Sequence, residues 1–323
     1  MKRRLFLAAA SLAPSLAWAQ GQPRIAYLSG RSAATDSHLL EAFREGLKSA
    51  GYVDGQNVSL DVRWADGRYG EMPRLAAEVV ATKPDVIVAV GGNPVGVAAK
   101  AATPTIPIVF GAGAGADPIK IGLVNNLNRP DGNLTGMTLW ANELDAKRLD
   151  LLHDMLPAAR TVAVLMNPLN PGYDDLLPRT RETAVALGLK LEMLTASSSS
   201  EIERAFQSLA PGKVDALAVG ADAFMINSRA RILALTNERR LPAIFPAREF
   251  AVDGGLASYG TRWADMYKIL GSYTGRILKG AKIAELPVQR PATYELVINL
   301  QTARALGLEL PPLILTRADE VIE

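Results

Sequence analysis

The polar residues best placed for chemistry in this chain follow its short apolar segments, where parallel strands would end. Asp222 is the first of them, because a carboxylate at the edge of a cleft is a natural partner for a ligand ammonium group. Backbone N–H groups, hydroxyls and amides at neighbouring strand ends would then hold the carboxylate of the same ligand. The predicted ligand-binding residues are Ser29, Ser32, Gly92, Asn93, Ala114, Asp117, Asn167, Asp222, Phe224, Arg248 and Tyr259.

Several of these residues have structural roles equally open to them. Asp222 is also suited to cap a helix over residues 223–238. Phe224 and Tyr259 would either stack on an apolar or aromatic ligand or pack in a core. Arg248 would either face the ligand or pair with Glu249 or solvent. The sequence leaves each of these alternatives open.

The run G-A-G-A-G-A at 111–116 has the letters of a dinucleotide-binding fingerprint. That fingerprint belongs after the first strand of its unit, with an acidic residue ending the second strand about 20 residues later. Here the run follows a fourth apolar segment, and Asp131 lies in a turn signal, N-R-P-D-G-N. We therefore expect no NAD site. A tight turn for packing and a loop that holds a ligand carboxylate remain open, with Asp117–Pro118 starting a helix.

Motifs for catalysis and for metal binding are missing from this sequence. His38 and His153, the two histidines, each lie within an amphipathic helical segment. The chain has no cysteine, no G-x-S-x-G and no HExxH. We therefore expect no enzymatic activity, no cofactor and no metal ion.

Residues 1–19 differ from the rest of the chain. A basic start at 2–4, an apolar run and the ending Ala17-Trp18-Ala19 predict a signal peptide cleaved before Gln20, exported by the secretory or the twin-arginine route. Its removal leaves 32 of the 35 basic residues against 33 acidic ones, so the mature chain is close to neutral. A near-neutral chain lacks the excess positive charge that nucleic-acid binding needs. Since no cysteine is available for a lipid anchor, we expect a soluble periplasmic protein.

The 323 residues are enough for two domains, and their pattern repeats. Short apolar segments alternate with amphipathic helical ones, and this alternation predicts parallel sheets covered by helices. Asp36 is the predicted cap of the first helical segment. Asp85 and Asp215 lie 130 positions apart in similar segments. The predicted fold is therefore α/β, with two doubly wound parallel-sheet lobes. The expected strands are 24–30, 57–65, 84–92 and 105–113, then 161–168, 189–196, 214–222 and 241–250.

The lobes are predicted to be joined by three crossovers. Apolar segments with glycine at 133–140 and 255–261 suggest the first two, and the proline-containing segment 285–299 suggests the third. A long helical segment after residue 261 would return to the first lobe. The predicted division is 1–19 signal peptide, 20–136 plus 259–287 lobe one, and 137–258 plus 288–323 lobe two.

Long motifs in the chain closely resemble those of the ABC-transporter substrate-binding proteins of the tryptophan/tyrosine type. They lie at 117–138, 147–171, 254–261, 273–308 and 317–323. The resemblance implies a type I periplasmic binding fold that closes on a small ligand between its lobes. It also implies delivery of that solute to an ABC permease and its ATPase, and we expect a monomer.

The sequence departs from the family pattern at three places. Relatives that hold aromatic amino acids typically show an acidic-Asn pair where this chain has Asp222-Ala223. Gly91-Gly92-Asn93-Pro94 replaces the commoner Gly-Thr-Pro, and the loop before Asp117 is about two residues longer. The first two departures leave the ligand open, so we expect an amino acid or another carboxylate-bearing compound.

Two other functional classes compete with this interpretation. A sensory effector domain of the lactose-repressor kind shares the two-lobe fold, but a DNA-binding headpiece would occupy the place of the predicted signal peptide. A cofactor-dependent enzyme on doubly wound domains would retain its cofactor.

Overall fold

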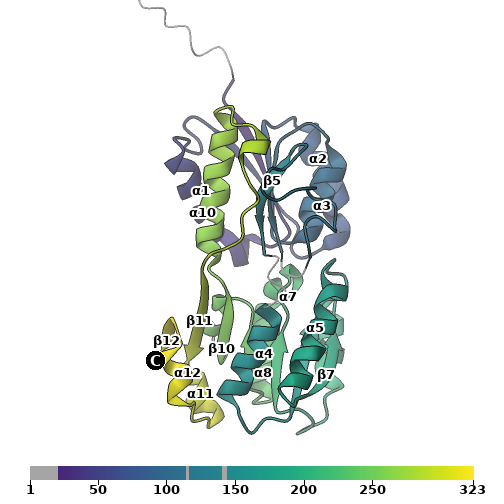
Figure 1. Ribbon diagram of the computed structural model, residues 1–323, viewed down its shortest axis with the longest axis vertical. Coiled ribbons are helices and arrows are strands. Elements are labelled where there is room, and N and C mark those ends of the chain that lie inside the picture. Colours follow the sequence, from purple (N-terminus) through teal and green to yellow (C-terminus); the bar gives the residue numbers. More distant parts are fainter. Residues whose placement is uncertain (1–20, 114–115, 140–143) are drawn as a thin grey trace, which may run out of the picture.

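The computed structural model describes residues 21–113, 116–139 and 144–323, which form two α/β lobes, each with its own sheet (Figure 1). The predicted signal peptide lies outside the described residues. The two lobes and their predominantly parallel sheets confirm the predicted fold class. None of the helices in the described part of the chain has the length and apolar character needed to cross a membrane.

The first lobe has a wholly parallel sheet with the strand order β2-β1-β3-β4-β5. The helices α1 and α10 cover one face, where Tyr27, Phe43 and Leu270 are buried, and α2 and α3 cover the other (Figure 1). Its elements are β1 (Arg24–Ser29), α1 (Ala33–Ser49), β2 (Ser59–Trp64), η1 (Tyr69–Glu71), α2 (Met72–Ala81), β3 (Val86–Val90), α3 (Asn93–Ala102), β4 (Ile108–Ala112), β5 (Leu134–Thr138), α10 (Trp263–Leu278) and η2 (Ile283–Glu285).

The second lobe has the strand order β12-β11-β10-β9-β8-β6-β7, parallel except for the antiparallel pair β10 and β11. Leu152 of α4 and Ile314 of α12 are buried in one of its cores, and Phe206 of α6 and Phe250 of α9 in the other. Its elements are α4 (Leu144–Met155), β6 (Thr161–Met166), α5 (Tyr173–Ala186), β7 (Lys190–Thr195), α6 (Ser199–Gln207), β8 (Ala216–Val219), α7 (Ala223–Asn227), α8 (Arg229–Glu238), β9 (Ala243–Phe245), α9 (Arg248–Val252), β10 (Ala257–Thr261), β11 (Tyr294–Asn299), α11 (Leu300–Leu306), α12 (Pro312–Thr316) and β12 (Glu320–Ile322).

The internal repeat predicted from the sequence is present in the strand order. The order β2-β1-β3-β4-β5 recurs as β7-β6-β8-β9-β10 in the second sheet. The paired aspartates have the same role in each lobe: Asp85 Oδ2 accepts a hydrogen bond of 2.7 Å from the Arg24 N–H, and Asp215 Oδ2 accepts one of 2.7 Å from the Arg160 N–H. Each carboxylate therefore accepts a hydrogen bond from a backbone N–H group at the start of the first strand of its lobe.

Two predicted crossover segments are strands instead. Segment 133–140 contains β5, and segment 255–261 contains β10, so both occupy the fifth position in their repeats. Their apolar residues are buried by pairing with β4 and β9, and the chain changes lobe only after each strand ends. The predicted lobe boundaries at 136/137 and 258/259 fall inside these two strands. After the third predicted boundary, at 287/288, residue 289 still bonds to β5.

Two helix starts also differ from the prediction. The helix α1 begins three residues before Asp36, because Ser32 is its N-cap and accepts a hydrogen bond from the Thr35 N–H. The Asp117 carboxylate accepts a hydrogen bond of 2.8 Å from the Ile119 N–H, as a helix cap would. The segment it caps is a turn and not a helix, and it ends at Gly122, whose φ is +71°.

The return helix α10 packs against α1 through glycines on both helices. A Cβ atom at Gly46 would overlap the carbonyl of Lys268, and one at Gly271 would overlap the carbonyl of Phe43. Only glycine allows the two backbones to approach this closely. The C-terminal part of the chain is thereby attached to the first lobe.

Gly271→Ala should destabilise the protein by about 2 kcal/mol, since the added methyl group must push α10 away from α1. The measurement is the free energy of unfolding from denaturant titration. Gly70→Ala is the matched control, because a Cβ atom there would meet nothing within 4 Å. Equal stability of the two variants would contradict the close packing of the helices.

Candidate functional site

The carboxyl ends of the strands in the two sheets face each other across a small cavity of about 20 Å³. Loops after β1, β3 and β4 approach it from the first lobe, and loops after β6 and β8 approach it from the second. Trp263, the first residue of α10, also lines it. The lining residues are Arg31, Tyr69, Gly91, Gly92, Gly111, Gly113, Asn170, Ala221, Asp222, Ala223, Ile226 and Trp263.

Asp222 is the polar centre of this cavity. Its Oδ1 accepts hydrogen bonds of 2.9 Å from Asn167 Nδ2 and 2.9 Å from the Phe224 N–H. Its Oδ2 accepts one of 2.5 Å from the Tyr69 hydroxyl and one of 3.2 Å from Asn170 Nδ2. The carboxylate is the N-cap of α7, so the structural alternative is correct, and it also lies at the cleft. Tyr69 is the donor that comes from the other lobe.

Burial sets the protonation behaviour of this pair. Burial raises the pKa of Asp222, while the hydrogen bonds from Tyr69 and Asn167 act against that rise without cancelling it. Burial and then the neighbouring Asp222 charge raise the pKa of Tyr69 well above its ordinary value. The phenol therefore keeps its proton at neutral pH and acts as a donor to the carboxylate.

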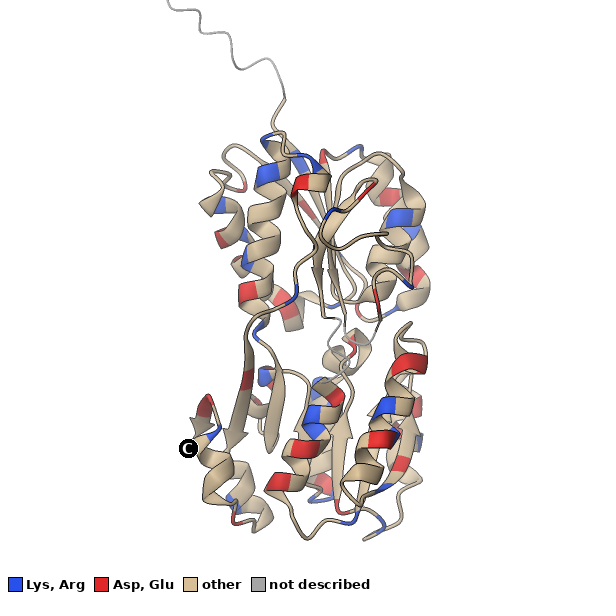
Figure 2. Cartoon of the chain, in the orientation of Figure 1, with Lys and Arg blue, Asp and Glu red and all other residues tan. Residues whose placement is uncertain are grey.

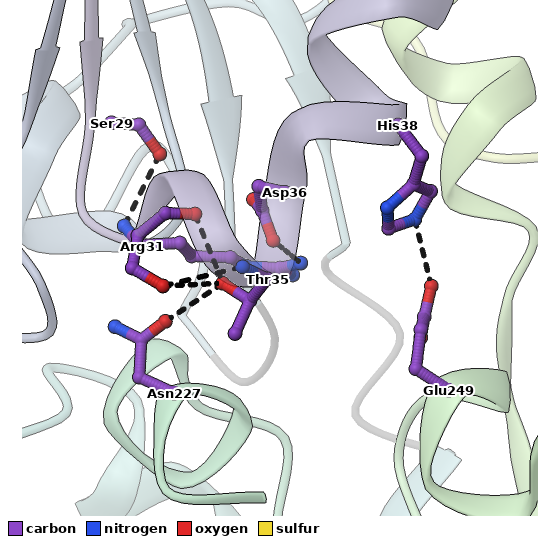
Figure 3. Close-up of polar contacts among 8 residues, drawn as sticks. Ser29, Arg31, Thr35, Asp36, His38, Asn227 and Glu249 are labelled. Carbon is purple, nitrogen blue, oxygen red and sulfur yellow. Dashed lines mark hydrogen bonds and ion pairs between the residues drawn. The ribbon is translucent and has the colours of Figure 1, made fainter. Parts of the chain in front are cut away.

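Other polar contacts also join the two lobes (Figure 3). The Thr35 hydroxyl on α1 donates to Asn227 Oδ1 on α7 at 3.1 Å. His38 Nε2, also on α1, lies 2.9 Å from Glu249 Oε1 on α9. With the bond between Tyr69 and Asp222, these contacts hold the lobes in a closed arrangement.

Three of the predicted site residues do not line the cavity but hydrogen-bond to residues or loops that do. Asn167 orients Asp222, and its own Oδ1 accepts from the Leu169 N–H at 2.9 Å. The Ser29 hydroxyl is fully buried and accepts from the Arg31 N–H at 3.1 Å. Ser32 caps α1. Their polar atoms serve the loops that carry the lining residues.

The glycine-containing loops come together on the side of the first lobe. Gly92 lines the cavity with a φ of +134°, and Asn93 is buried at the start of α3. A Cβ atom at Gly113 would lie 3.4 Å from the Gly92 Cα, so Gly113 lies close to the loop after β3. Asp117 is half-buried in its turn. Ala114, also predicted as a site residue, lies outside the described residues.

The structure does not bring three predicted residues to this cavity. Phe224, on α7, belongs to the second-lobe core that also contains Met225 and Ile232. Arg248 pairs with Glu320 at 2.5 Å and with Glu295 at 3.8 Å. It therefore does not face the cavity, and its ion-pair partners among the described residues do not include Glu249, which was one of the predicted alternatives.

Tyr259 is displaced because it lies on β10 and not on a crossover. Its ring lies 6.4 Å from that of Tyr294, and both line a separate pocket against α4 and α5.

The cavity is also lined by Arg31, Tyr69 and Trp263, which were not among the predicted site residues. Each had a usable signal. Arg31 stands inside the polar segment after the first predicted strand, Tyr69 follows the second, and Trp263 starts the predicted return helix. Their convergence depends on how the lobes pack.

A larger pocket of about 480 Å³ lies beyond Trp263 and contains charged groups that pair among themselves. Arg229 bonds to Asp253 at 2.7 Å, and Arg262 lies 3.5 Å from Glu295. Charges of both signs are also interspersed over both lobes (Figure 2). Within the residues described, no group of three His, Cys, Asp or Glu side chains is placed to hold a metal ion.

The family described as ABC transporter substrate binding protein matches residues 32–322. The chain belongs to this family. It is an ABC transporter substrate-binding protein. The family is one of binding proteins and not of enzymes, and it works with a membrane permease and an ATPase.

Two characterised relatives carry ligand names. The substrate-binding protein is 28% identical over 269 residues to a tyrosine-binding protein of Clostridioides difficile, covering 83% of this chain and 76% of the relative. It is 25% identical to an ABC domain from Streptococcus pneumoniae solved in complex with L-Trp, covering 94% of this chain and 100% of that chain with a TM-score of 0.82.

The arrangement of the lobes can be compared with an open relative. A ligand-free, open structure of a Clostridium difficile substrate-binding protein with adhesive properties is also 25% identical, covers 93% of this chain and 99% of its own, and has a TM-score of 0.65. The TM-score is lower for this open structure than for the complex with L-Trp, although the sequence identity is the same. This difference agrees with the hydrogen bonds that join the two lobes here. The structure is closer in shape to the complex with L-Trp than to the open form.

Tyr69→Phe should open the ligand-free substrate-binding protein. The substitution removes the hydrogen bond from the other lobe to the Asp222 carboxylate, and such bonds contribute about 1.5–3 kcal/mol. The expected result is a larger radius of gyration in small-angle X-ray scattering. Tyr52→Phe is the control, since Tyr52 packs beside Gly275 within the first lobe. An unchanged radius in Tyr69→Phe would show that this bond does not hold the lobes closed.

Proposed function

We propose that this protein binds an amino acid or a related carboxylate-bearing compound between its lobes, by hinge closure, and delivers it to an ABC permease. The observation that carries the proposal is Asp222, a buried carboxylate at the cavity that accepts a hydrogen bond from the opposite lobe. A ligand ammonium group would replace the Tyr69 hydroxyl there. A charged donor forms a stronger hydrogen bond to a carboxylate than a neutral one does.

The size of the cavity implies that the lobes must separate before the ligand enters. A cavity of about 20 Å³ holds about one water molecule and not an amino acid. Separation would break the contacts that Tyr69, Thr35 and His38 make with the second lobe. Asp222 would keep Asn167 and the Phe224 N–H, which belong to its own lobe. The second lobe would thus hold a preoriented carboxylate for the incoming ligand.

The ligand contacts proposed for the remaining residues follow their positions. Backbone N–H groups near Gly92 and Asn93 would face the ligand carboxylate, with Gly111, Gly113 and Asp117 beside them. Trp263, Tyr69 and Ile226 offer apolar surface to its side chain. The names of the relatives place tyrosine and tryptophan first among the compounds to test.

A thermal-shift screen against amino acids, small carboxylates and nucleotides tests this proposal. A ligand present at about 100 times its dissociation constant should stabilise the folded protein by roughly 2.7 kcal/mol. Asp222→Asn keeps an oxygen for the Phe224 N–H but removes the charge, and Asn93→Ala removes the amide. Each should reduce the stabilisation, whereas Asp61→Asn on the edge strand β2, where the side chain is 42% exposed, should not. Unchanged stabilisation in both site variants would rule out this site.

We further propose that the protein is periplasmic, monomeric, free of cofactor and without catalytic activity or nucleic-acid binding. Native mass spectrometry of the exported protein examines the first three points together. The expected species is a monomer that begins at Gln20 and carries no tightly bound cofactor. A species that retains residues 1–19, a dimer or a bound nucleotide would contradict the corresponding part of the proposal.

A further inference from the structure

Arg31 is a buried cation at the first-lobe side of the cavity. Its side chain is 5% exposed, and it lines the same cavity as Asp222, which belongs to the second lobe. It follows β1 directly, and its own N–H donates to Ser29 Oγ, which fixes the backbone from which the side chain extends. The guanidinium is therefore held in place before any ligand enters.

The guanidinium has only part of its hydrogen-bonding capacity in use. Its face lies 4.3 Å from the centre of the Trp263 ring. Nη1 donates to Asp36 Oδ1 at 3.2 Å (Figure 3). Its Nε is buried and has no hydrogen-bond partner among the described residues. A guanidinium carries five N–H donors in one plane, arranged to match a carboxylate. An unsatisfied buried donor is costly unless a ligand completes it.

The charges around the cavity are arranged with opposite signs on the two lobes. Asp36 lies behind Arg31 on α1 and is itself fully buried, so the first lobe carries a compensated cation. Asp222 faces the cavity from the second lobe. Burial alone would lower the pKa of Arg31, but the charge and hydrogen bond of Asp36, together with the nearby Tyr267 and Glu249, outweigh it and raise that pKa above the ordinary value. A ligand with both an ammonium and a carboxylate group would match this arrangement.

We propose that Arg31 binds the carboxylate of the ligand, so that the protein selects carboxylic acids over their neutral amides. This inference rests on the proposed function, because it concerns the same cavity. Trp263 positions the guanidinium by stacking on its face and leaves its edge for the ligand. Asp36 holds Nη1 and prevents the side chain from turning away from the cavity.

The test compares each acid with its amide. The probes are L-tryptophan with L-tryptophanamide and benzoate with benzamide, and binding to the mature protein is measured by calorimetry. The wild type should prefer the acids. Replacing Arg31 alone would leave Asp36 buried and unpaired, which threatens folding. The double variant R31Q/D36N removes both charges and should reduce the preference for acids by about 10- to 100-fold.

Two control variants separate this role from general damage. Asp36→Asn keeps the Arg31 charge and an oxygen that can accept from Nη1, but it removes the countercharge, so its folding is checked first by thermal unfolding; the folded variant should keep most of the preference. Arg44→Gln removes a half-exposed arginine of α1 that pairs with Glu41 and Asp54, and it should bind like the wild type.

Each other outcome has a definite meaning. A full preference for acids in R31Q/D36N, or amides that bind the wild type as well as the acids do, would overturn the role of Arg31. The proposed function would stand if binding still depended on Asp222. If none of the amino acids and carboxylates of the thermal-shift screen bound the wild type, the carboxylate-bearing ligand class would be wrong, and the role of Arg31 with it.

Discussion

The burial of the Asp222 carboxylate is the constraint on which the cleft depends. A charge removed from water must be surrounded by donors, and here they come from three separate segments. Asn167 and Asn170 follow β6, the Phe224 N–H belongs to α7, and the Tyr69 hydroxyl crosses from the other lobe. The second lobe by itself supplies most of the hydrogen bonds that the carboxylate accepts. At this point the lobes are therefore joined only by the Tyr69 hydroxyl, a donor that a ligand could replace.

The two sheets place this carboxylate opposite the first lobe. Because each lobe repeats the same strand order, the loops after corresponding strands meet at the cleft. The close approach of α10 to α1 through Gly46 and Gly271 then returns the chain to the first lobe. Trp263, the first residue of α10, reaches the cavity for this reason and stacks on Arg31.

Local patterns predicted much of the fold and part of the site. The strands that start at Arg24 and Thr161 were predicted because apolar runs between turn signals depend only on neighbouring residues. Asp222 was predicted for a similar reason, as a polar residue that follows a buried strand. Arg248 satisfied the same local rule, and Tyr259 was predicted on a crossover, but Glu320 and the strand β11 direct them elsewhere. The rule identifies strand ends and does not identify which side chains turn toward the other lobe.

The sequence by itself determined that this is a two-lobed α/β protein without a dinucleotide fingerprint in its proper place, since the order of its segments and its repeat are properties of the chain. The tertiary structure decided which groups share the cavity. Arg31, Tyr69 and Trp263 are far apart in the chain, and no local pattern relates them. They meet Asp222 only because the packing of α10 on α1 and the closure of the lobes bring distant backbone segments within hydrogen-bonding distance.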